Sequence, residues 1–168
     1  MRVLFTNAGR RTYLVQYALD LAARDYPVEI FVSDSTIDAA ALHVSPDART
    51  ILLPRVDSGE DIYMAALRDA VAKHRIDVII PLSDFDIDAL ARAKDDFAHR
   101  GVTAVVGKPD IVARATDKRR ADEFCRAAGL PTPESAFAAE DYRGRFPCMV
   151  KKIHGSAGHG QYVADGPD

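Results

Sequence analysis

A glycine-rich run near the end of the chain is the segment best suited to chemistry. Gly155, Gly158 and Gly160 fall within six residues. The positions between them hold small or polar residues: Ser156, Ala157 and His159. Because glycine has no Cβ, backbone N–H groups there can approach phosphate oxygens closely. Lys151, just before the run, would add a positive charge. The run therefore predicts either a phosphate-binding loop or a flexible hairpin, which residue types alone support about equally.

A second group of polar residues follows the predicted strands of the N-terminal half: Gly9, Arg10, Arg11, Asp34, Ser83 and Asp84. Ligands of open α/β sheets usually bind beyond the carboxyl ends of the strands. The two arginines could receive an anion at a helix N-terminus or form a solvated turn. Asp34 could bind a substrate hydroxyl or ammonium, or cap a helix. We predict a substrate site from this group, with caps and surface turns as the alternative.

Several familiar sites are excluded by spacing. Gly9 is the sole glycine of its turn, so the dinucleotide fingerprint GxGxxG is missing. Pro109 stands where a Walker loop would need serine or threonine. Asp84, Asp86 and Asp88 lack the glycine and final glutamate of a calcium loop, so helix capping explains them better. His154 and His159 lie five positions apart in a loop, but no Cys or carboxylate stands at ligand spacing beside them, so no zinc site is expected.

Alternating apolar runs and amphipathic segments indicate how these residues are positioned. Short runs rich in β-branched residues predict strands over 3–5, 28–32, 50–53, 78–80 and 103–106. Helical periodicity predicts helices over 13–24, 61–74 and 86–100. It places Leu14, Tyr17, Ala18 and Leu21 on one face of the first helix, and Ile62, Ala65, Ala66, Asp69 and Ala72 on one face of the second. The pattern predicts an α/β fold, a Rossmann-like doubly wound parallel sheet.

The rhythm changes after Pro109. We predict a short helix over 110–115, then a helix capped by Thr116 or Asp117 that runs to 128 and stops at Gly129. Strands are expected over 135–138, 148–152 and 161–163. Three such strands cannot enclose a core by themselves, so we expect an incomplete α+β lobe in a chain that stops inside a domain.

Composition excludes several classes of protein. The chain has 168 residues, of which 48% are hydrophobic and 28% charged, with a formal charge of −3. There is no basic excess for general nucleic-acid binding and no apolar run long enough to span a membrane. Cys125 and Cys148 form no disulfide framework, and we expect both to be small core residues. We expect a cytoplasmic protein.

The C-terminal segment resembles the ATP-grasp superfamily. The similarity covers the strand that ends in Lys151, the lid over 155–160, and the upstream residues Thr116-Asp117-Lys118. The resemblance implies that Lys118 and Lys151 contact ATP and that the glycine-rich lid covers its phosphates. His159 departs from the arginine that many relatives have in the lid.

The N-terminal residues, Asn7 to Arg11, Asp34 and 81–84, resemble the pre-ATP-grasp domain of proteins similar to the carbamoyl-phosphate synthase large subunit. This gives a pre-ATP-grasp domain over 1–113 and a partial ATP-grasp lobe over 114–168. It implies an ATP-dependent carboxylate-amine or carboxylate-thiol ligase that works through an acyl phosphate. Its cofactors would be ATP and Mg²⁺, with the metal ligands in a C-terminal half beyond this chain. This chain alone is expected to be inactive, and a homodimer is one possible assembly. The alternative is a stand-alone Rossmann-like module that binds a small ligand or a partner without catalysis.

Overall fold

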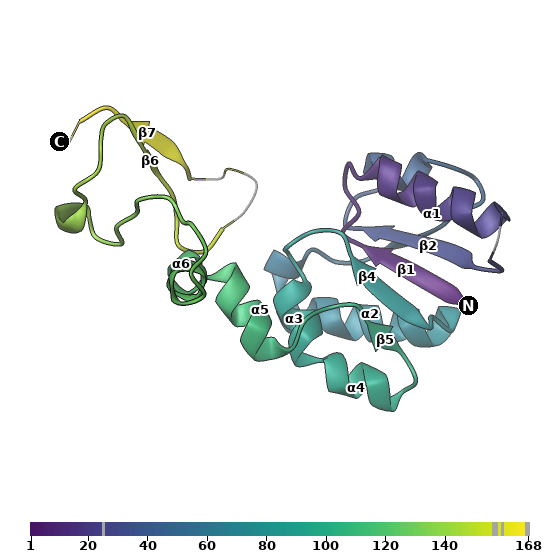
Figure 1. Cartoon of the computed structure of the whole chain (residues 1–168). Coiled ribbons are helices and arrows are strands. Elements are labelled where there is room, and N and C mark those ends of the chain that lie inside the picture. The colour runs from purple at the N-terminus through teal and green to yellow at the C-terminus, as the bar shows by residue number, and fades with distance from the viewer. Residues whose placement is uncertain (25, 156–157, 159, 167–168) are drawn as a thin grey trace. The chain divides into compact units, whose positions relative to one another are not determined.

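The computed structural model describes residues 1–24, 26–155, 158 and 160–166 (Figure 1). Contacts divide the chain into two compact units, Met1–Pro109 and Asp110–Asp168. The following paragraphs take each unit by itself. The assignment of 1–113 and 114–168 as domains of an ATP-grasp protein stays a prediction.

The first unit is built on a five-stranded parallel sheet. Its strands are β1 (Arg2–Thr6), β2 (Glu29–Asp34), β3 (Arg49–Leu52), β4 (Val78–Pro81) and β5 (Thr103–Ala104). Their order is β3-β2-β1-β4-β5, and every neighbouring pair is parallel. The predicted doubly wound parallel sheet is confirmed. β5 is shorter than predicted, and Val106 N–H turns back to the carbonyl of Ala104.

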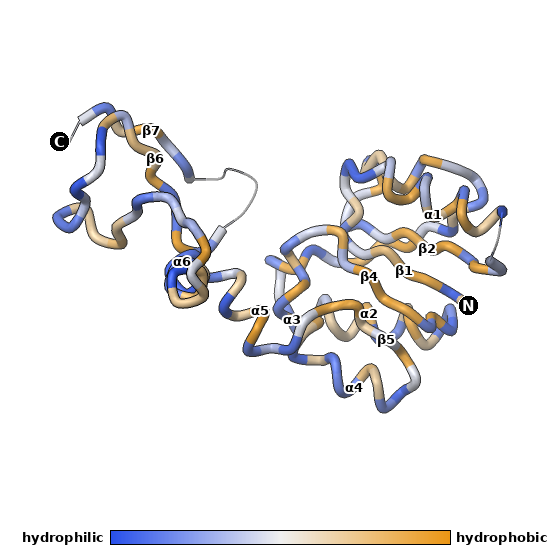
Figure 2. Tube along the Cα trace, viewed as in Figure 1, coloured by the Kyte–Doolittle hydropathy of each residue, from blue (hydrophilic) through white to orange (hydrophobic). Residues whose placement is uncertain are grey.

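Helices cover both faces of this sheet. They are α1 (Thr12–Arg24), α2 (Glu60–His74), α3 (Ile87–Arg92) and α4 (Lys94–His99), with the 3-10 helices η1 (Ala40–His43) and η2 (Val56–Ser58). Figure 1 shows α1 on one side of the strands and α2 and α4 on the other. Each face has its own apolar cluster, one around Val3, Val15 and Val32, the other around Leu4, Leu67 and Ile79. The strands are the most hydrophobic segments of this unit (Figure 2).

The predicted apolar faces of the first two helices are only partly the buried ones: Ala18 and Ala66 pack against the apolar clusters, but other members are exposed. Val15 is the buried residue of α1, whereas Tyr17 is 63% exposed. In α2 the buried residues include Tyr63 and Leu67, whereas Ile62 is 60% exposed. Both helices carry apolar residues on more than one side, so periodicity by itself selects no single face.

The predicted helix over 86–100 is two helices joined at Ala93. This residue has φ −91° and ψ 2°, outside helical values, yet its N–H still bonds to the carbonyl of Ala89. Leu90 and Phe97 are both buried on the same cluster. The apolar pattern therefore continues across the bend, which is why the sequence did not reveal it.

The second unit holds two helices and a short antiparallel sheet. α5 (Pro109–Thr116) runs into it, followed by α6 (Lys118–Ala127), the 3-10 helix η3 (Ala139–Asp141), β6 (Cys148–Val150) and β7 (Tyr162–Ala164). β6 and β7 pair with Cys148 opposite Ala164 and Val150 opposite Tyr162. The two predicted helices and the last two predicted strands are confirmed, but both cysteines are half-buried rather than core residues.

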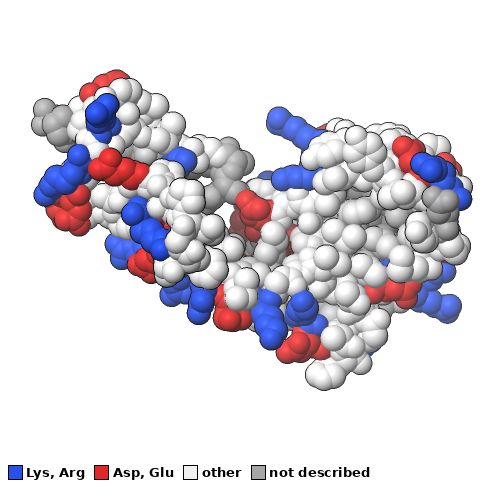
Figure 3. Space-filling view, in the orientation of Figure 1, with Lys and Arg blue, Asp and Glu red and all other residues white. Residues whose placement is uncertain are grey.

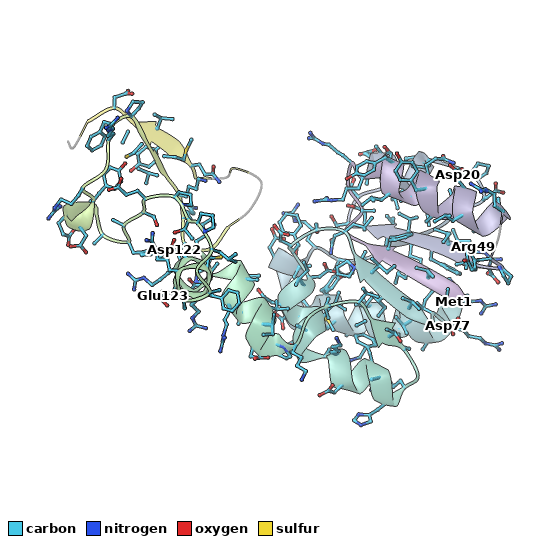
Figure 4. The ribbon with its side chains drawn as sticks, in the orientation of Figure 1. Met1, Asp20, Arg49, Asp77, Asp122 and Glu123 are labelled. Atoms are coloured by element: carbon cyan, nitrogen blue, oxygen red, sulfur yellow. The ribbon has the colours of Figure 1, made fainter. Side chains whose placement is uncertain are left out.

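The predicted strand over 135–138 is wrong. Ser135 Oγ donates to Asp122 Oδ1 at 3.4 Å, and the Arg119 guanidinium lies 4.9 Å from the centre of the Phe137 ring. Asp122 also accepts from Arg126 Nε at 2.7 Å, and its place on α6 is labelled in Figure 4. Contacts with one face of a helix thus replace the strand partner that this segment would need.

Candidate functional site

The strand order of the first unit creates a switch point at β1. This strand has β2 on one side and β4 on the other, because the chain crosses over on one face and then on the opposite face. The loops that follow β1 and β4 diverge at such a point and leave a place for ligands. Gly9 to Arg11 follow β1, Asp34 ends β2, and Ser83 and Asp84 follow β4. The fold therefore brings the predicted substrate residues to one edge of the sheet.

Asp34 joins the loops after β1 and β2. Its Oδ2 accepts from the Gly9 N–H at 2.8 Å, and its Oδ1 accepts from the Ser35 N–H at 2.7 Å. Gly9 has φ +54°, a left-handed conformation that glycine adopts at little cost. The carboxylate thus closes the glycine turn instead of capping a helix, while a contact with substrate stays a prediction.

The two arginines lie directly before α1. Arg10 is exposed and Arg11 is half-buried. A Cβ on Gly9 would lie 3.9 Å from Arg11 Nη1, so this guanidinium folds back over the turn. Their proposed contact with an anion remains a prediction.

Sequence reasoning missed a buried hydrogen-bond network beneath this edge. The Tyr63 hydroxyl donates to Asp86 Oδ2 at 2.6 Å, and Asn7 Nδ2 donates to the Tyr63 oxygen at 3.4 Å. Tyr63 and Asp86 are both fully buried. Burial, followed by the negative charge of Asp86, raises the pKa of Tyr63 far above its usual value. The phenol is therefore a neutral donor at any ordinary pH.

The helix-capping interpretation of Asp86 is wrong. Asp86 occupies the N-cap position of α3, but its side chain makes no capping hydrogen bond. Its carboxylate points instead to Tyr63. Nothing in the spacing of the acids over 84–88 distinguishes this inward aspartate from its neighbours, because the partner lies 23 residues away on another helix.

Ser83 and Asp84 lie in the loop between β4 and α3. Ser83 is 8% exposed, and Asp84 is exposed. Leu82 N–H donates to the carbonyl of Thr6 at 3.0 Å, which ties the start of this loop to the end of β1. Ser83 therefore lies nearly buried at the carboxyl edge of the sheet, and its contact with a substrate stays a prediction.

In the second unit, Lys118 is joined to the start of the glycine-rich loop. Its Nζ donates to the carbonyl oxygens of Ile153 at 3.3 Å and Gly155 at 3.0 Å. Its backbone N–H also donates to the Ile153 carbonyl at 3.3 Å. Residues 35 and 37 positions apart are thereby brought together. This places a predicted phosphate-binding lysine beside the predicted lid.

Asp117 supports the same junction. Its Oδ1 accepts from the N–H groups of Arg119 and Arg120 at 2.9 and 3.0 Å, which caps α6. His154 Nε2 lies 3.6 Å from its Oδ2. The pKa of Asp117 is lowered, first by the Arg120 N–H and further by Arg119 and His154. The carboxylate therefore stays ionised and fixes the helix terminus from which Lys118 extends.

The loop itself has the backbone of a glycine-dependent turn. Gly160 has φ +69°, and a Cβ there would lie 2.5 Å from Lys152 Cε, so the Lys152 side chain packs over it. Lys151 directly follows β6 and is exposed. Gly155 and Gly158 also have positive φ. The predicted lid residues Ser156, Ala157 and His159 lie outside the described residues.

Charges of both signs are spread over the second unit in the view of Figure 3. Within the residues the structure describes, no group of three or more His, Cys, Asp or Glu side chains could hold a metal ion. Nor does any helix of that described part have the length and apolar character to cross a membrane.

A hollow of about 410 Å³ lies at the opposite, amino edge of the parallel sheet. Arg68, Arg75 and Arg100 line it, together with Asp77 and the apolar Phe97. Asp77 also accepts from the Arg2 N–H at 2.7 Å, and Figure 4 labels it beside Met1. None of the predicted site residues lies there.

Comparison with known proteins relates this chain to one protein family and to several longer relatives. Residues 3–105 match the family described as PylC-like, N-terminal domain. The chain is 30% identical over 159 residues to a formate-dependent phosphoribosylglycinamide formyltransferase of Parasynechococcus marenigrum, covering 88% of this chain and 37% of that protein. It is 26% identical to a carbamoyl-phosphate synthase of Methanobrevibacter smithii, covering 100% of this chain and 44% of the relative. The chain thus spans less than half the length of these relatives.

Solved structures share the fold. An N5-carboxyaminoimidazole synthetase from Staphylococcus aureus superposes with a TM-score of 0.63 at 16% identity, covering 98% of this chain and 41% of that one. Such low identity supports the common fold alone. The likeness to the carbamoyl-phosphate synthase group that the sequence motifs indicated is confirmed by the relatives.

Proposed function

We propose that this chain, which belongs to the family of PylC-like N-terminal domains, is the N-terminal part of an ATP-dependent ligase. That family is a pre-ATP-grasp part of the ATP-grasp superfamily. Such an enzyme joins a carboxylate to an amine or a thiol. The first unit would bind a small substrate at the carboxyl edge of its sheet, and the second would bind the phosphates of ATP.

The observation that carries the proposal is the junction between Lys118 and the glycine-rich loop. The ammonium lies within hydrogen-bonding distance of two carbonyls at the start of the loop, Ile153 and Gly155. The same loop has open space where a Cβ would stand at Gly158, and only Lys152 Cβ comes within 4 Å of that position at Gly155. Ammonium and backbone N–H groups are the donors that phosphate oxygens prefer, so the residues present fit a triphosphate.

ATP, when bound, supplies the phosphoryl group that activates the carboxylate. The task of this chain is then to hold the phosphates and to exclude water. Lys118 and Lys151 neutralise negative charge, and the loop over 155–160 covers it. Asp117 keeps α6 capped so that Lys118 extends from a fixed helix terminus.

Exposed apolar side chains on the β6–β7 pair also support a larger protein. Met149, Tyr162 and Val163 are each more than half exposed. A two-stranded sheet is marginal in water unless another element covers its apolar side chains. In the proposed enzyme a further part of the ATP-grasp fold covers them. That part would also contribute the Mg²⁺ ligands.

The test is the affinity for ATP, measured by calorimetry in the longer protein that this proposal requires. Lys151→Ala is expected to weaken binding by roughly 1.5 to 3 kcal/mol, the range for charge-assisted hydrogen bonds. Lys118→Ala is expected to weaken binding in the same direction. Lys73→Ala, which removes an exposed lysine of α2, is the matched control and leaves affinity unchanged. Unchanged affinity in both test variants would remove these lysines from the site.

A further inference from the structure

The hollow at the amino edge of the sheet combines three arginines with an apolar lining. Its volume of about 410 Å³ lies within the range of roughly 300 to 1,000 Å³ that small-molecule sites occupy. It lies where α2 and α4 end and where the chain enters β4 and β5. The arginines are Arg68, Arg75 and Arg100, and the apolar side chains include Val71, Ile76, Phe97 and Val102. All of these residues belong to the first unit, so the hollow does not depend on the second.

Asp96 holds two of these arginines beside each other. Its Oδ2 accepts from Arg68 Nε at 3.1 Å, and its Oδ1 accepts from Arg100 Nε at 3.0 Å. These two hydrogen bonds lower the pKa of Asp96, so the carboxylate stays ionised at neutral pH. The Nη1 and Nη2 donors of both arginines make no hydrogen bond to any residue that the structure describes. One carboxylate thus orients two guanidinium groups and leaves most of their donors open.

Arg75 lacks even a carboxylate partner. Among the ion pairs formed by the described part of the chain, none includes this arginine. Helix C-termini attract cations, and Arg75 and Arg100 directly follow α2 and α4. Backbone groups already cap both ends, however. The Arg75 N–H donates to the Ala72 carbonyl at 3.3 Å. The Arg100 N–H donates to the Phe97 carbonyl at 3.0 Å. The guanidinium groups are therefore not needed to satisfy these carbonyls.

The charge of the hollow selects an anion. Against the three arginines stand the carboxylates of Asp77 and Asp96, so one positive charge is in excess. A carboxylate ligand has two oxygens, which a single guanidinium fork fills. A phosphate monoester has three terminal oxygens and a charge of about −1.5 to −2 at pH 7, so it takes donors from several arginines. Three arginines around one hollow therefore match a phosphate better than a carboxylate.

We propose that this hollow binds a phosphate monoester that carries an apolar organic group. The three guanidinium groups hold the phosphate, and the organic group takes the remaining space against the apolar lining. The site goes beyond the proposed ligase function, because it lies at the edge of the sheet opposite Asp34 and Ser83. It also belongs to a different unit from the glycine-rich loop that is proposed to bind ATP.

The probe is phenyl phosphate, titrated into the isotope-labelled 168-residue chain and followed by the amide signals of Asp77, Gly101 and Val102. Inorganic phosphate tests the anion alone, benzoate tests a carboxylate on the same ring, and benzyl alcohol tests the neutral ring. We expect saturable shifts at these three amides, with phenyl phosphate binding more tightly than each of the other compounds. No saturable shift there, or equal affinity for benzoate, inorganic phosphate or benzyl alcohol, would overturn the proposal.

Variants of the arginines locate the binding. Arg75→Gln removes a guanidinium that has no ion-pair partner among the described residues, so the urea midpoint should stay the same. Its affinity for phenyl phosphate should fall by about threefold or more, since exposed charge pairs each contribute modestly. Arg100→Gln should weaken binding in the same direction. The matched control is Lys73→Gln, which removes an exposed positive charge of α2 that does not line the hollow.

The control variant separates a built site from a general attraction between charges. Lys73→Gln should bind phenyl phosphate as the unmodified chain does. Equal weakening in Lys73→Gln and Arg75→Gln would mean that the anion responds only to the positive charge of this surface, and it would contradict the site. Unaltered affinity in a folded Arg75→Gln variant would contradict it as well.

Discussion

Removing the Tyr63 hydroxyl is the perturbation whose size the structure defines best. In Tyr63→Phe the ring still fills its place in the apolar cluster with Leu4, Leu67 and Ile79. What disappears is the donor that lies 2.6 Å from Asp86 Oδ2. Since Asp86 Oδ1 already lacks a partner, the variant leaves a completely buried carboxyl group with no described donor.

The expected cost follows from that loss. A typical hydrogen bond contributes about 1 kcal/mol, but orphaning a buried group costs about 1 to 3 kcal/mol, and more when the group is charged. We therefore expect Tyr63→Phe to lower the free energy of unfolding of the first unit by about 2 to 3 kcal/mol. With a urea m-value of about 1 to 3 kcal/mol/M, the midpoint should fall by roughly 0.7 to 3 M.

The assay is urea unfolding followed by circular dichroism, with Tyr13→Phe as the control. Tyr13 is 57% exposed, so the same chemical change there should alter stability by no more than about 0.5 kcal/mol. A second variant, Tyr63→Phe with Asp86→Asn, should recover part of the loss because no charge is then stranded. If Tyr63→Phe and Tyr13→Phe unfold at the same urea concentration, the description of the buried network is refuted.

Further outcomes follow from the same structure. Folding raises the pKa of Tyr63, so the stability that this phenol contributes is complete below pH 10 and is lost as pH rises above that value. The urea midpoint should therefore fall above pH 10, and it should fall less steeply in Tyr63→Phe. Folding lowers the pKa of Asp117, so its cap on α6 should be complete above the ordinary carboxyl pKa of 3.8 and should be lost as pH falls below that value. The amide chemical shifts of Arg119 and Arg120 should report this loss. Asp117→Ala should show the shifts of the uncapped helix already at neutral pH. In Gly9→Ala the new Cβ would lie no closer than 3.9 Å to any atom, but the residue would have to keep φ at +54°, so the free energy of unfolding should fall by about 1 kcal/mol. Gly166→Ala is the control and should leave the urea midpoint unchanged. An unchanged midpoint in Gly9→Ala would contradict a left-handed turn at Gly9.

Local sequence patterns were enough to predict the parallel sheet. Its strands are short apolar runs rich in valine and isoleucine, and helical segments separate them, which leaves little choice but a doubly wound arrangement. The cap at Asp117 and the end of α6 near Gly129 were likewise predictable, because both depend on residues next to one another in the chain.

Most of the errors concern contacts between residues distant in sequence. Tyr63 and Asp86 meet across 23 positions, and the segment around Phe137 packs on Arg119 instead of pairing as a strand. The face that α1 buries depends on which of its apolar sides meets the sheet. The bend at Ala93 leaves the apolar spacing intact. No local pattern carries this information, because it arises from tertiary packing.

The resemblance to ATP-grasp proteins implied both where the site residues lie and what they bind. Lys118 lies beside the loop, as the motif implied, and Asp34 closes the Gly9 turn. These placements are compatible with a nucleotide lid and a substrate edge. The nucleotide and substrate contacts themselves, at Lys151, Arg10 and Arg11, stay predictions.

The most direct test of the ligase proposal is ADP release by the longer protein, measured against a panel of small carboxylates paired with amines or thiols. The proposal predicts that ADP appears when a carboxylate and its nucleophile are both present. Lys151→Ala should reduce kcat/KM for ATP roughly 10- to 100-fold, while Lys73→Ala leaves it unchanged. ADP release that needs no carboxylate, or that is the same in the Lys151→Ala and Lys73→Ala variants, would contradict the account.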